Sequence, residues 1–391
     1  MLPSSLDWLP EELDRLERDQ LRRRLSERES AQGSEVVIDG RRLVNFGAND
    51  YLGLAADSRL AEAAIASIQG TGWGSGASPL VSGRSTVHAQ LETKLAQFEE
   101  TEAALLFPSG FAANAGTIPA LVGEGDAIYA DANNHASLID GARLSKAVRV
   151  IYPHGDWRAL ADLLAKDGNY RRRLIVTDSL FSMDGDLAPL VEIAQLATEY
   201  SAMLIVDEAH ATGVWGARGR GVVEYLAERA PDLEQQVTLR VGTLSKALGA
   251  SGGFVCGSQM LIDWLVNNAR TYIYSTAAES VSAAAGIEAL KIVEQEPERR
   301  TSLLERSRQL RDALTAREWD LAGSQSQIVP IVIGSAERTM DTAARIREAG
   351  LFVPGIRPPT VAPGRSRLRV SLSYVHSPEV IERLVEAIGV R

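Results

Sequence analysis

The chain has 391 residues, of which 45% are hydrophobic and 24% are charged, so it can bury a large core in two domains or in one domain with an added lobe. Its net charge of −10 at pH 7 argues against a nucleic acid or an anionic membrane as partner, because both favour basic surfaces. The single cysteine, Cys256, excludes an intrachain disulfide. Residues 1–20 lack a signal-peptide pattern, and no apolar run reaches membrane-spanning length, so we expect a cytoplasmic protein.

The N-terminal part predicts a helix followed by a hairpin. Leucines at 13, 16, 21 and 25 predict an amphipathic helix over residues 10–28. Two apolar runs at residues 36–38 and 43–46 flank Asp39-Gly40, which is typical of a β-hairpin. A further helix is expected from residue 58 to 68, and a glycine-dense loop follows it.

Residues 85 to 257 alternate between helical and strand patterns. The predicted helices are 86–99, 111–122, 136–144, 157–165 and 189–200, and the predicted strands are 104–107, 127–129, 148–151, 174–177 and 203–206. This alternation is typical of a mostly parallel sheet between helices, an α/β doubly wound architecture. Ligands bind at the carboxyl ends of the strands in such folds.

Residues 237–257 predict a strand, a tight turn and a second strand, with Lys246 in the turn. The residues around Lys246 are small, which lets backbone or ligand approach closely. A lysine held out of bulk water can act as an amine nucleophile toward a carbonyl. An ordinary turn lysine is the alternative at this point.

The sequence pattern changes after residue 276. An alanine-rich helical region extends to about residue 317 with a break near Pro297, and a small α+β lobe follows. Its expected elements are strands 328–333, 352–353 and 368–372, helix 339–348 and a final helix from Pro378. We therefore predict an N-terminal arm (1–50) packing with a small domain (277–391), and a large domain (51–276).

Polar residues follow several of the predicted strands. Asp207 ends one strand and His210 comes three residues later, so the carboxylate could hold a positively charged ring nitrogen and the histidine could bond a neighbouring oxygen. The alternatives are a turn cap and a backbone-bonded histidine. A metal site is not expected, because there are only five histidines and no H-x-x-x-H pair.

Two further strand ends offer binding groups. Ser109-Gly110-Phe111 opens a helix, whose free amides suit a phosphate, although an ordinary βα turn fits equally. His135 could stack on a planar ring, or it could cap a helix. The G-x-G-x-x-A at Gly72 lacks a preceding strand, and Ser251 within G-x-S-x-G enters a strand instead of a helix, so dinucleotide and hydrolase interpretations are disfavoured.

Several long motifs then occur in one order along nearly the whole chain. They are NDYLGL from Asn49, SGFAAN with Gly110, FSMDGDLAPL with Ser182, VDEAHATGVWGARGRG with Asp207 and His210, TLSKALGASGG with Lys246, and RLRV with Arg369. This set resembles the α-oxoamine synthases, which are pyridoxal-phosphate enzymes of the aspartate-aminotransferase fold. The resemblance implies that fold, with a mostly parallel sheet in a large domain and a smaller α+β C-terminal domain. Ser245 departs from it, since some members have glycine there.

The resemblance also implies roles for matching residues. Lys246 would bond covalently to the cofactor, Asp207 would pair with its ring nitrogen, and His135 would stack on the ring and contact substrate. The remaining expected contacts are Gly110, Phe111 and Thr243 with the phosphate; Ser182 and His210 with the ring oxygen; Ser275 and Thr276 with the phosphate in the partner subunit; and Arg22, Asn49, Thr360 and Arg369 with substrate. The implied assembly is a homodimer with active sites at the subunit interface.

Within the family, Ile356-Arg357-Pro358-Pro359-Thr360-Val361 is most similar to the biotin-pathway member. That similarity implies an acyltransferase that condenses L-alanine with a pimeloyl thioester, on coenzyme A or acyl carrier protein, with loss of CO2. The alternatives are another α-oxoamine synthase that uses glycine or serine, and a catalytically silent subunit. The presence of Lys246 argues against the silent subunit, because such proteins typically lose this lysine.

Overall fold

The computed structural model describes residues 4–166 and 168–391. The chain divides into two compact units: a large unit of residues 49–182 and 186–304, and a small unit of the residues up to 48 together with 183–185 and 305–391. The predicted boundary after residue 276 therefore differs from the boundary after residue 304. The reason is α12 (Ser280–Gln295), which packs against α2 (Ser58–Thr71) and α3 (Thr86–Glu99) of the large unit.

The large unit is built on one seven-stranded sheet, in the order β3-β9-β8-β7-β6-β4-β5. Its strands are β3 (Ala103–Phe107), β4 (Ala127–Asp131), β5 (Val148–Tyr152), β6 (Arg173–Asp178), β7 (Met203–Asp207), β8 (Leu239–Thr243) and β9 (Gly253–Gly257). β9 runs antiparallel to both of its neighbours, and the five strands from β8 to β5 are parallel. The mostly parallel sheet predicted from the alternating pattern is confirmed.

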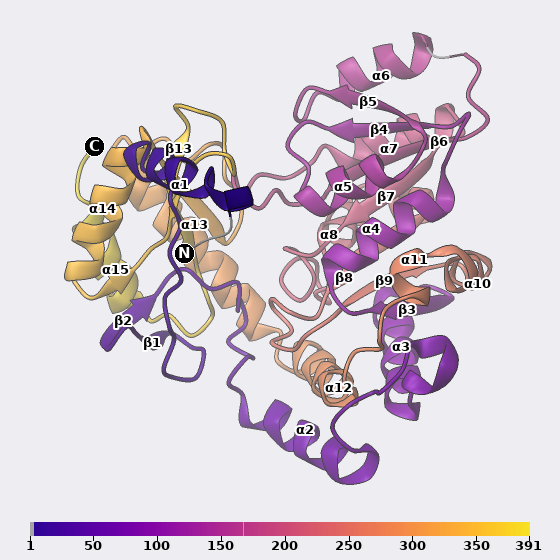
Figure 1. The fold of residues 1–391 in the computed structure, drawn as a ribbon, viewed down its shortest axis with the longest axis horizontal. Helices are drawn as coiled ribbons and strands as arrows, with labels where there is room; N and C mark the ends of the chain where they lie inside the picture. Colours follow the sequence, from indigo (N-terminus) through magenta and orange to yellow (C-terminus); the bar gives the residue numbers. More distant parts are fainter. Residues whose placement is uncertain (1–3, 167) are drawn as a thin grey trace. The chain divides into compact units, whose positions relative to one another are not determined.

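Helices surround this sheet (Figure 1). They are α4 (Gly110–Leu121), α5 (Ala136–Leu144), α6 (Trp157–Lys166), α7 (Leu190–Glu199), α8 (Val222–Ala227), α9 (Leu233–Gln236), α10 (Gln259–Asn268) and α11 (Arg270–Ile273), with a short π-helix η2 (Pro79–Gly83). The central strands are almost entirely buried: every residue of β8 is buried, and β6 and β7 each have only a half-buried first residue. Residues buried on both faces of a sheet give the near-continuous apolar runs from which these strands were predicted.

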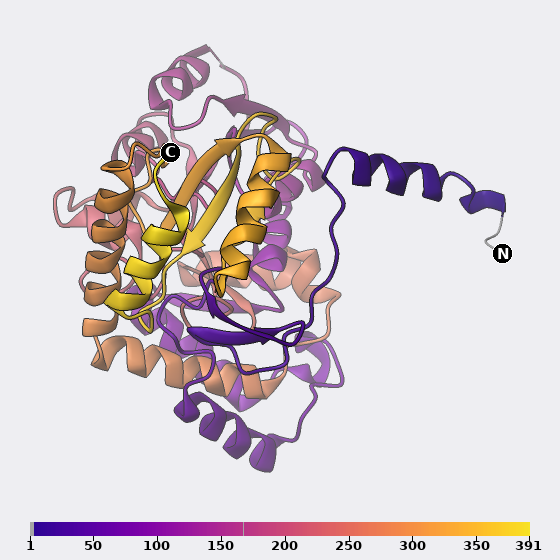
Figure 2. The same ribbon diagram turned by 90° about the vertical axis from the view of Figure 1, so that its left-hand side faces the viewer.

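The small unit contains two three-stranded sheets. One joins β1 (Glu35–Ile38), β2 (Arg41–Asn45) and β11 (Leu351–Phe352), and the other joins β10 (Ile328–Gly334), β13 (Ser366–Ser371) and β12 (Gly355–Ile356). Asp39 and Gly40 turn the β1–β2 hairpin with φ of 50° and 72°, as predicted for an Asp-Gly turn. Figure 2 shows α14 (Ala336–Glu348) beside the strands β10 and β13, with α15 (Pro378–Ile388) in yellow.

Two helical predictions had different outcomes. The break near Pro297 is confirmed, because α12 ends at Gln295 and α13 (Glu298–Thr315) begins beyond the proline. The helix predicted over residues 10–28 was too long, since α1 spans only Leu9–Arg18. No residue of α1 is buried and Leu25 is fully exposed, so no packing extends the helix through the arginines that follow. In the part of the chain that the structure describes, no helix is long and apolar enough to cross a membrane.

Candidate active site

Acids from neighbouring parallel strands meet at one edge of the large-unit sheet. Asp178 ends β6 and Asp207 ends β7, and the two residues are direct partners in the strand register. Both are buried. Burial, together with the negative charge of Asp207, raises the pKa of Asp178 well above its usual range.

Lys246 follows β8, the next strand in the sheet, in the turn that leads to β9. The predicted strand, turn and strand are therefore confirmed. Lys246 is half-buried, and its positive charge acts on His135 and on Asp178. The structure thus brings the predicted lysine, aspartate and histidine of the site into one electrostatic neighbourhood.

A short chain of hydrogen bonds joins Asp207 to His135. The Asn114 side-chain amide donates to Asp207 Oδ2 at 2.6 Å and to Ser137 Oγ at 2.9 Å. Ser137 Oγ lies 2.7 Å from His135 Nδ1. The His135 backbone N–H donates to Asp178 Oδ2 at 2.7 Å, so His135 is held through its backbone as well as its ring.

The start of α4 presents backbone amides at the place where the phosphate contacts are expected. Ser109 caps the helix by accepting from the Ala112 N–H, and the amides of Gly110 and Phe111 begin the first turn, where no intrahelical acceptor exists. A side chain on Gly253 would place its Cβ 2.3 Å from Gly110 N, so only glycine lets β9 pass this close beneath the helix start. Thr243 lies against Gly110, at the end of β8.

Thr243 has two hydrogen-bond partners of its own. Its hydroxyl donates to the Gly252 carbonyl at 2.9 Å and lies 2.8 Å from Ser245 Oγ. Because the single Thr243 proton is used by Gly252, Ser245 is the donor to Thr243. The serine that departs from the family pattern therefore supports the threonine that the pattern assigns to the phosphate.

His210 joins a second polar group of the large unit. His210 Nδ1 lies 2.7 Å from the Tyr51 hydroxyl, which also lies 3.1 Å from Asn49 Oδ1. The structure therefore links two predicted residues, His210 and Asn49, through a tyrosine that was not singled out. Tyr51 is fully buried. Ser182 lies beyond the end of β6, just before the chain passes into the small unit.

Three predicted substrate residues belong to the small unit. Arg369 lies on β13 and its guanidinium donates to Ser371 Oγ at 2.8 Å. Arg22 uses its carbonyl to accept from Arg357, while Thr360 Oγ1 accepts from Arg23 at 3.4 Å. The arm and the Pro-Pro-Thr segment are therefore joined, with Arg23 as the residue that contacts Thr360.

Ser275 and Thr276 follow α11 in the large unit. Together with Phe107 and Pro108 they line a cavity, which places them near the strand that leads to Ser109. Thr276 is exposed and Ser275 is half-buried.

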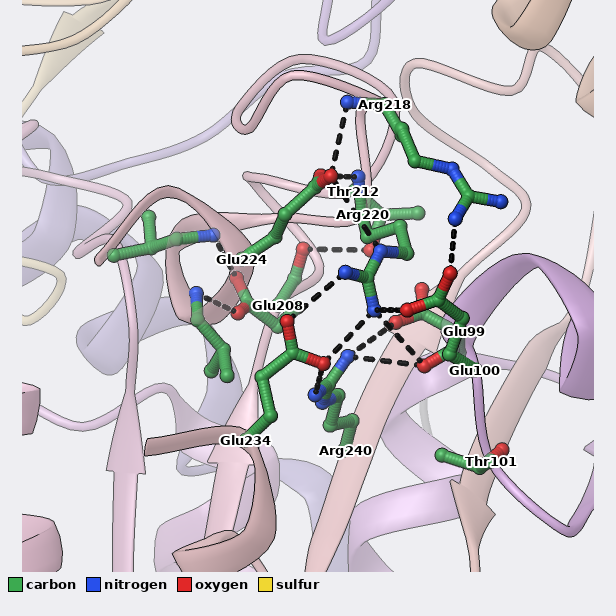
Figure 3. A network of polar contacts seen from close by, with 12 residues as sticks. Glu99, Glu100, Thr101, Glu208, Thr212, Arg218, Arg220, Glu224, Glu234 and Arg240 are labelled. Carbon is green, nitrogen blue, oxygen red and sulfur yellow. Dashed lines mark hydrogen bonds and ion pairs between the residues drawn. The ribbon is translucent and has the colours of Figure 1, made fainter. Parts of the chain in front are cut away.

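Glu208 anchors the loop that carries Asp207 and His210. Its carboxylate is buried and accepts from Ser179 Oγ at 2.6 Å and from the N–H groups of Val222 and Val223 at 3.0 and 2.8 Å. Figure 3 shows Glu208 beside a larger network of arginines and glutamates. Sequence reasoning assigned no individual role to Tyr51, Asn114, Ser137, Asp178 or Glu208. All of them except Ser137 carried a signal: Tyr51, Asn114 and Glu208 lie in the NDYLGL, SGFAAN and VDEAHATGVWGARGRG motifs, and Asp178 directly follows the predicted strand 174–177.

The chain can now be placed in a class of enzymes. A family model described as aminotransferase class I and II matches residues 41–388, so the chain belongs to that family. A serine palmitoyltransferase from S. paucimobilis with bound PLP–myriocin aldimine has the same fold, with a TM-score of 0.92 at 29% identity over 99% of this chain and 97% of that one. The predicted fold class is confirmed.

Sequence comparison identifies one family within this class of enzymes. 8-Amino-7-oxononanoate synthase from Symbiobacterium thermophilum is 45% identical over 97% of this chain and 96% of the relative. The enzyme of that name from Anaeromyxobacter sp. (strain Fw109-5) is 48% identical over 99% and 96% of the two chains. A solved 8-amino-7-oxononanoate synthase from Francisella tularensis has a TM-score of 0.76 at 28% identity, over 88% of this chain and 96% of that one. Within its class, the chain belongs to the 8-amino-7-oxononanoate synthase family.

Proposed function

We propose that this chain is a pyridoxal-phosphate-dependent acyltransferase of biotin biosynthesis. It condenses L-alanine with a pimeloyl thioester to give 8-amino-7-oxononanoate, CO2 and the free thiol carrier. The observation that carries this proposal is the meeting of Lys246, Asp207 and His135 at one sheet edge, in a chain 45% identical to an enzyme of that name over nearly its full length. The class I and II aminotransferase fold supports the same cofactor.

The residues of the large unit fit pyridoxal phosphate. When bound, this cofactor supplies an electron sink that stabilises negative charge at Cα of an amino acid. Gly110, Phe111 and Thr243 would hold the phosphate at the start of α4, which combines free amides with a helix dipole. Asp207 would keep a proton on the ring nitrogen, because a buried anion favours the charged form of its partner. Ser182 and His210 would bond the ring oxygen.

Lys246 would hold the cofactor and then act as a base. Its amine would take the proton from Cα of alanine, a step that needs the lysine within reach of both cofactor and substrate. His135 would cover the ring face and contact the substrate. Asn49 and Arg369 would orient the alanine carboxylate, for which a guanidinium fork has matching geometry. Arg22 and Thr360 would contact the acyl substrate from the small unit.

We propose a homodimer with active sites at the subunit interface, in the cytoplasm. Large apolar side chains at Val81 and Tyr274 are 79% and 71% exposed, next to Ser275 and Thr276, which supports a covered surface there. Cys256 is buried, and burial raises its thiol pKa well above the usual value, as suits a structural cysteine in a reducing compartment.

The direct test is product formation. Purified chain with pyridoxal phosphate, alanine and pimeloyl thioester should release thiol and give 8-amino-7-oxononanoate by mass spectrometry. Lys246→Ala should lower kcat by at least about 1,000-fold, because the group that holds the cofactor and moves the proton is lost. Borohydride reduction before peptide mapping should label Lys246 in the wild type.

A matched control is Lys146→Ala, which removes an exposed lysine after α5 and should leave the rate unchanged. Full turnover by Lys246→Ala would overturn the assignment of this lysine. Thiol release with glycine or serine in place of alanine would instead identify another α-oxoamine synthase. Coenzyme A and acyl carrier protein thioesters should be tested separately, because both present the same acyl group.

A further inference from the structure

His135 receives two hydrogen bonds on one ring nitrogen. The Ser137 backbone N–H donates to His135 Nδ1 at 3.3 Å, which caps the start of α5. The Ser137 hydroxyl lies 2.7 Å from the same nitrogen. A nitrogen that accepts from a backbone N–H must present a lone pair, so His135 Nδ1 carries no proton in this arrangement.

The hydroxyl proton of Ser137 can also be assigned. Asn114 donates one amide hydrogen to Ser137 Oγ at 2.9 Å and the other to Asp207 Oδ2 at 2.6 Å. The carboxylate of Asp207 only accepts, which fixes the amide orientation of Asn114. Because Ser137 Oγ accepts from Asn114, its own hydrogen is free to point to His135 Nδ1. Every donor in the chain from Asp207 to His135 then has one acceptor.

We propose that Ser137 is a positioning residue that holds His135 as the neutral tautomer with its proton on Nε2, and that Asn114 ties this arrangement to Asp207. Ser137 and Asn114 are each about 1% exposed, so water does not compete for these bonds. The His135 backbone is fixed independently by Asp178. Ser137 thus fixes which ring nitrogen of His135 carries the proton, and Asp178 fixes the position of the His135 backbone.

The consequence for catalysis rests on the proposed function. A neutral imidazole can stack on a cationic cofactor ring without charge repulsion, so the ring keeps the proton that Asp207 stabilises. Two titratable groups act on the imidazole. Partial burial lowers the pKa of His135 and the charge of Lys246 lowers it further, while the charge of Asp207 opposes both. Asp178 faces its backbone.

The tautomer can be read without catalysis. The full chain labelled with 15N-histidine, with and without added pyridoxal phosphate, should show an unprotonated Nδ1 and a protonated Nε2 for His135 in long-range 1H–15N spectra. Only five histidines are present, and His135→Gln assigns the signal. His154 is an internal reference, because it lies between two carboxylates and should show protons on both nitrogens.

Two variants complete the test. Ser137→Ala keeps the backbone N–H that donates to His135 Nδ1 but loses the hydroxyl that favours the neutral ring, so it should raise the pH of half-protonation of His135 by about 1 unit. Ser137→Thr keeps a hydroxyl and should restore the wild-type pattern. In the active enzyme, the acid limb of the kcat/KM profile should move to higher pH in Ser137→Ala by the same amount.

A proton on Nδ1 in the wild type would overturn the proposal, and that spectrum does not depend on how any variant folds. An unchanged His135 signal in Ser137→Ala, with the His154 signal intact, would also overturn it. Failure to convert alanine and pimeloyl thioester would contradict the proposed function and leave these spectra unaffected. The two hypotheses therefore fail in different measurements.

Discussion

His154 shows how one residue can fix a turn of the chain. Its Nδ1 lies 2.9 Å from Asp131 Oδ1 and its Nε2 lies 2.9 Å from Asp186 Oδ2. Burial opposes a charged imidazole, but the bonds to the two acids outweigh it and raise the pKa of His154 to about 10. Asp186 follows the three residues of the small unit that interrupt the large unit. A cation at His154 therefore anchors the point where the chain returns to the large unit.

The contacts of His154 with Asp131 and Asp186 predict a pH-dependent stability. A histidine with a raised folded-state pKa contributes fully below its unfolded value of about 6.5, and the contribution is lost as pH rises toward 10. We expect His154→Gln to lower the free energy of unfolding most at pH 6, and the difference from wild type to shrink by pH 10. Urea unfolding at a series of pH values measures it.

His376→Gln is the matched comparison, with the opposite slope. Burial lowers the pKa of His376 to about 4, so its neutral form is the one that the fold favours. Its contribution is complete above about pH 6.5 and falls as pH drops toward 4. A constant difference between His154→Gln and wild type from pH 6 to pH 10 would show that the two acids do not hold a charged histidine.

At the level of single residues, the sequence predicted the side chains expected to carry the chemistry better than it predicted the residues that hold those side chains in place. Lys246, Asp207 and His135 follow apolar strands, and parallel strands bring their carboxyl ends to one edge, so their meeting was predictable. Ser137 and Asn114 gave no comparable pattern. Their roles depend on α4 and α5 packing against each other, a contact between elements that local sequence does not specify.

Between elements, the large unit depends on a buried ion network (Figure 3). Arg240 on β8 pairs with Glu99 at the end of α3 at 3.2 Å and with Glu234 on α9 at 2.9 Å. Arg220 also pairs with Glu234, at 2.9 Å. Arg240 and Glu99 are almost fully buried. Burial raises the pKa of Glu99 to about 7 against the charge of Arg240, so this acid loses its proton only near neutral pH.

Removing Arg240 should therefore lower the free energy of unfolding more at high pH than at low pH. We expect Arg240→Met to destabilise the protein by about 3 to 5 kcal/mol at pH 8, because it leaves buried carboxylates without their partner. The loss should be smaller at pH 6, where Glu99 can keep its proton. Adding Glu99→Gln to Arg240→Met should remove this pH dependence, as measured by urea unfolding.

The control is Arg308→Met, which breaks an exposed pair with Glu305 on α13 and should cause no measurable loss. Equal losses for Arg240→Met at pH 6 and pH 8 would show that Glu99 does not titrate in this range. The network was invisible in the sequence, since its charges come from α3, β8 and α9 and each looks like a solvated helix or strand end when taken alone.

Across the whole molecule, the order of elements was predictable and their limits were less so. The alternation of helical and strand patterns of hydrophobic residues identified the sheet of the large unit. The final strands and helices identified an α+β small unit. The limit of α1 and the assignment of α12 were not predictable in the same way. A helix ends, or joins a unit, according to what it packs against. No residue of α1 is buried by the part of the chain that the structure describes, whereas α12 packs against α2 and α3.

Two exposed apolar side chains of the large unit predict a surface on which copies of the chain assemble. Val81 on η2 and Tyr274 after α11 are largely exposed on two elements that contact each other, and Ser275 and Thr276 lie directly beyond. If this surface joins two copies, light scattering should give twice the chain mass. Val81→Glu with Tyr274→Glu should then yield monomers with at least about 10-fold lower activity, because buried charges oppose association.

Leu144→Glu is the control. Leu144 is 65% exposed at the end of α5, and Ser275 follows α11, much later in the chain. The Leu144→Glu substitution should change neither mass nor rate. A fully active wild-type monomer would contradict the proposed dimer. A double variant that stays dimeric with normal activity would place the interface elsewhere, and Ser275 and Thr276 would lose their proposed role toward the partner's phosphate.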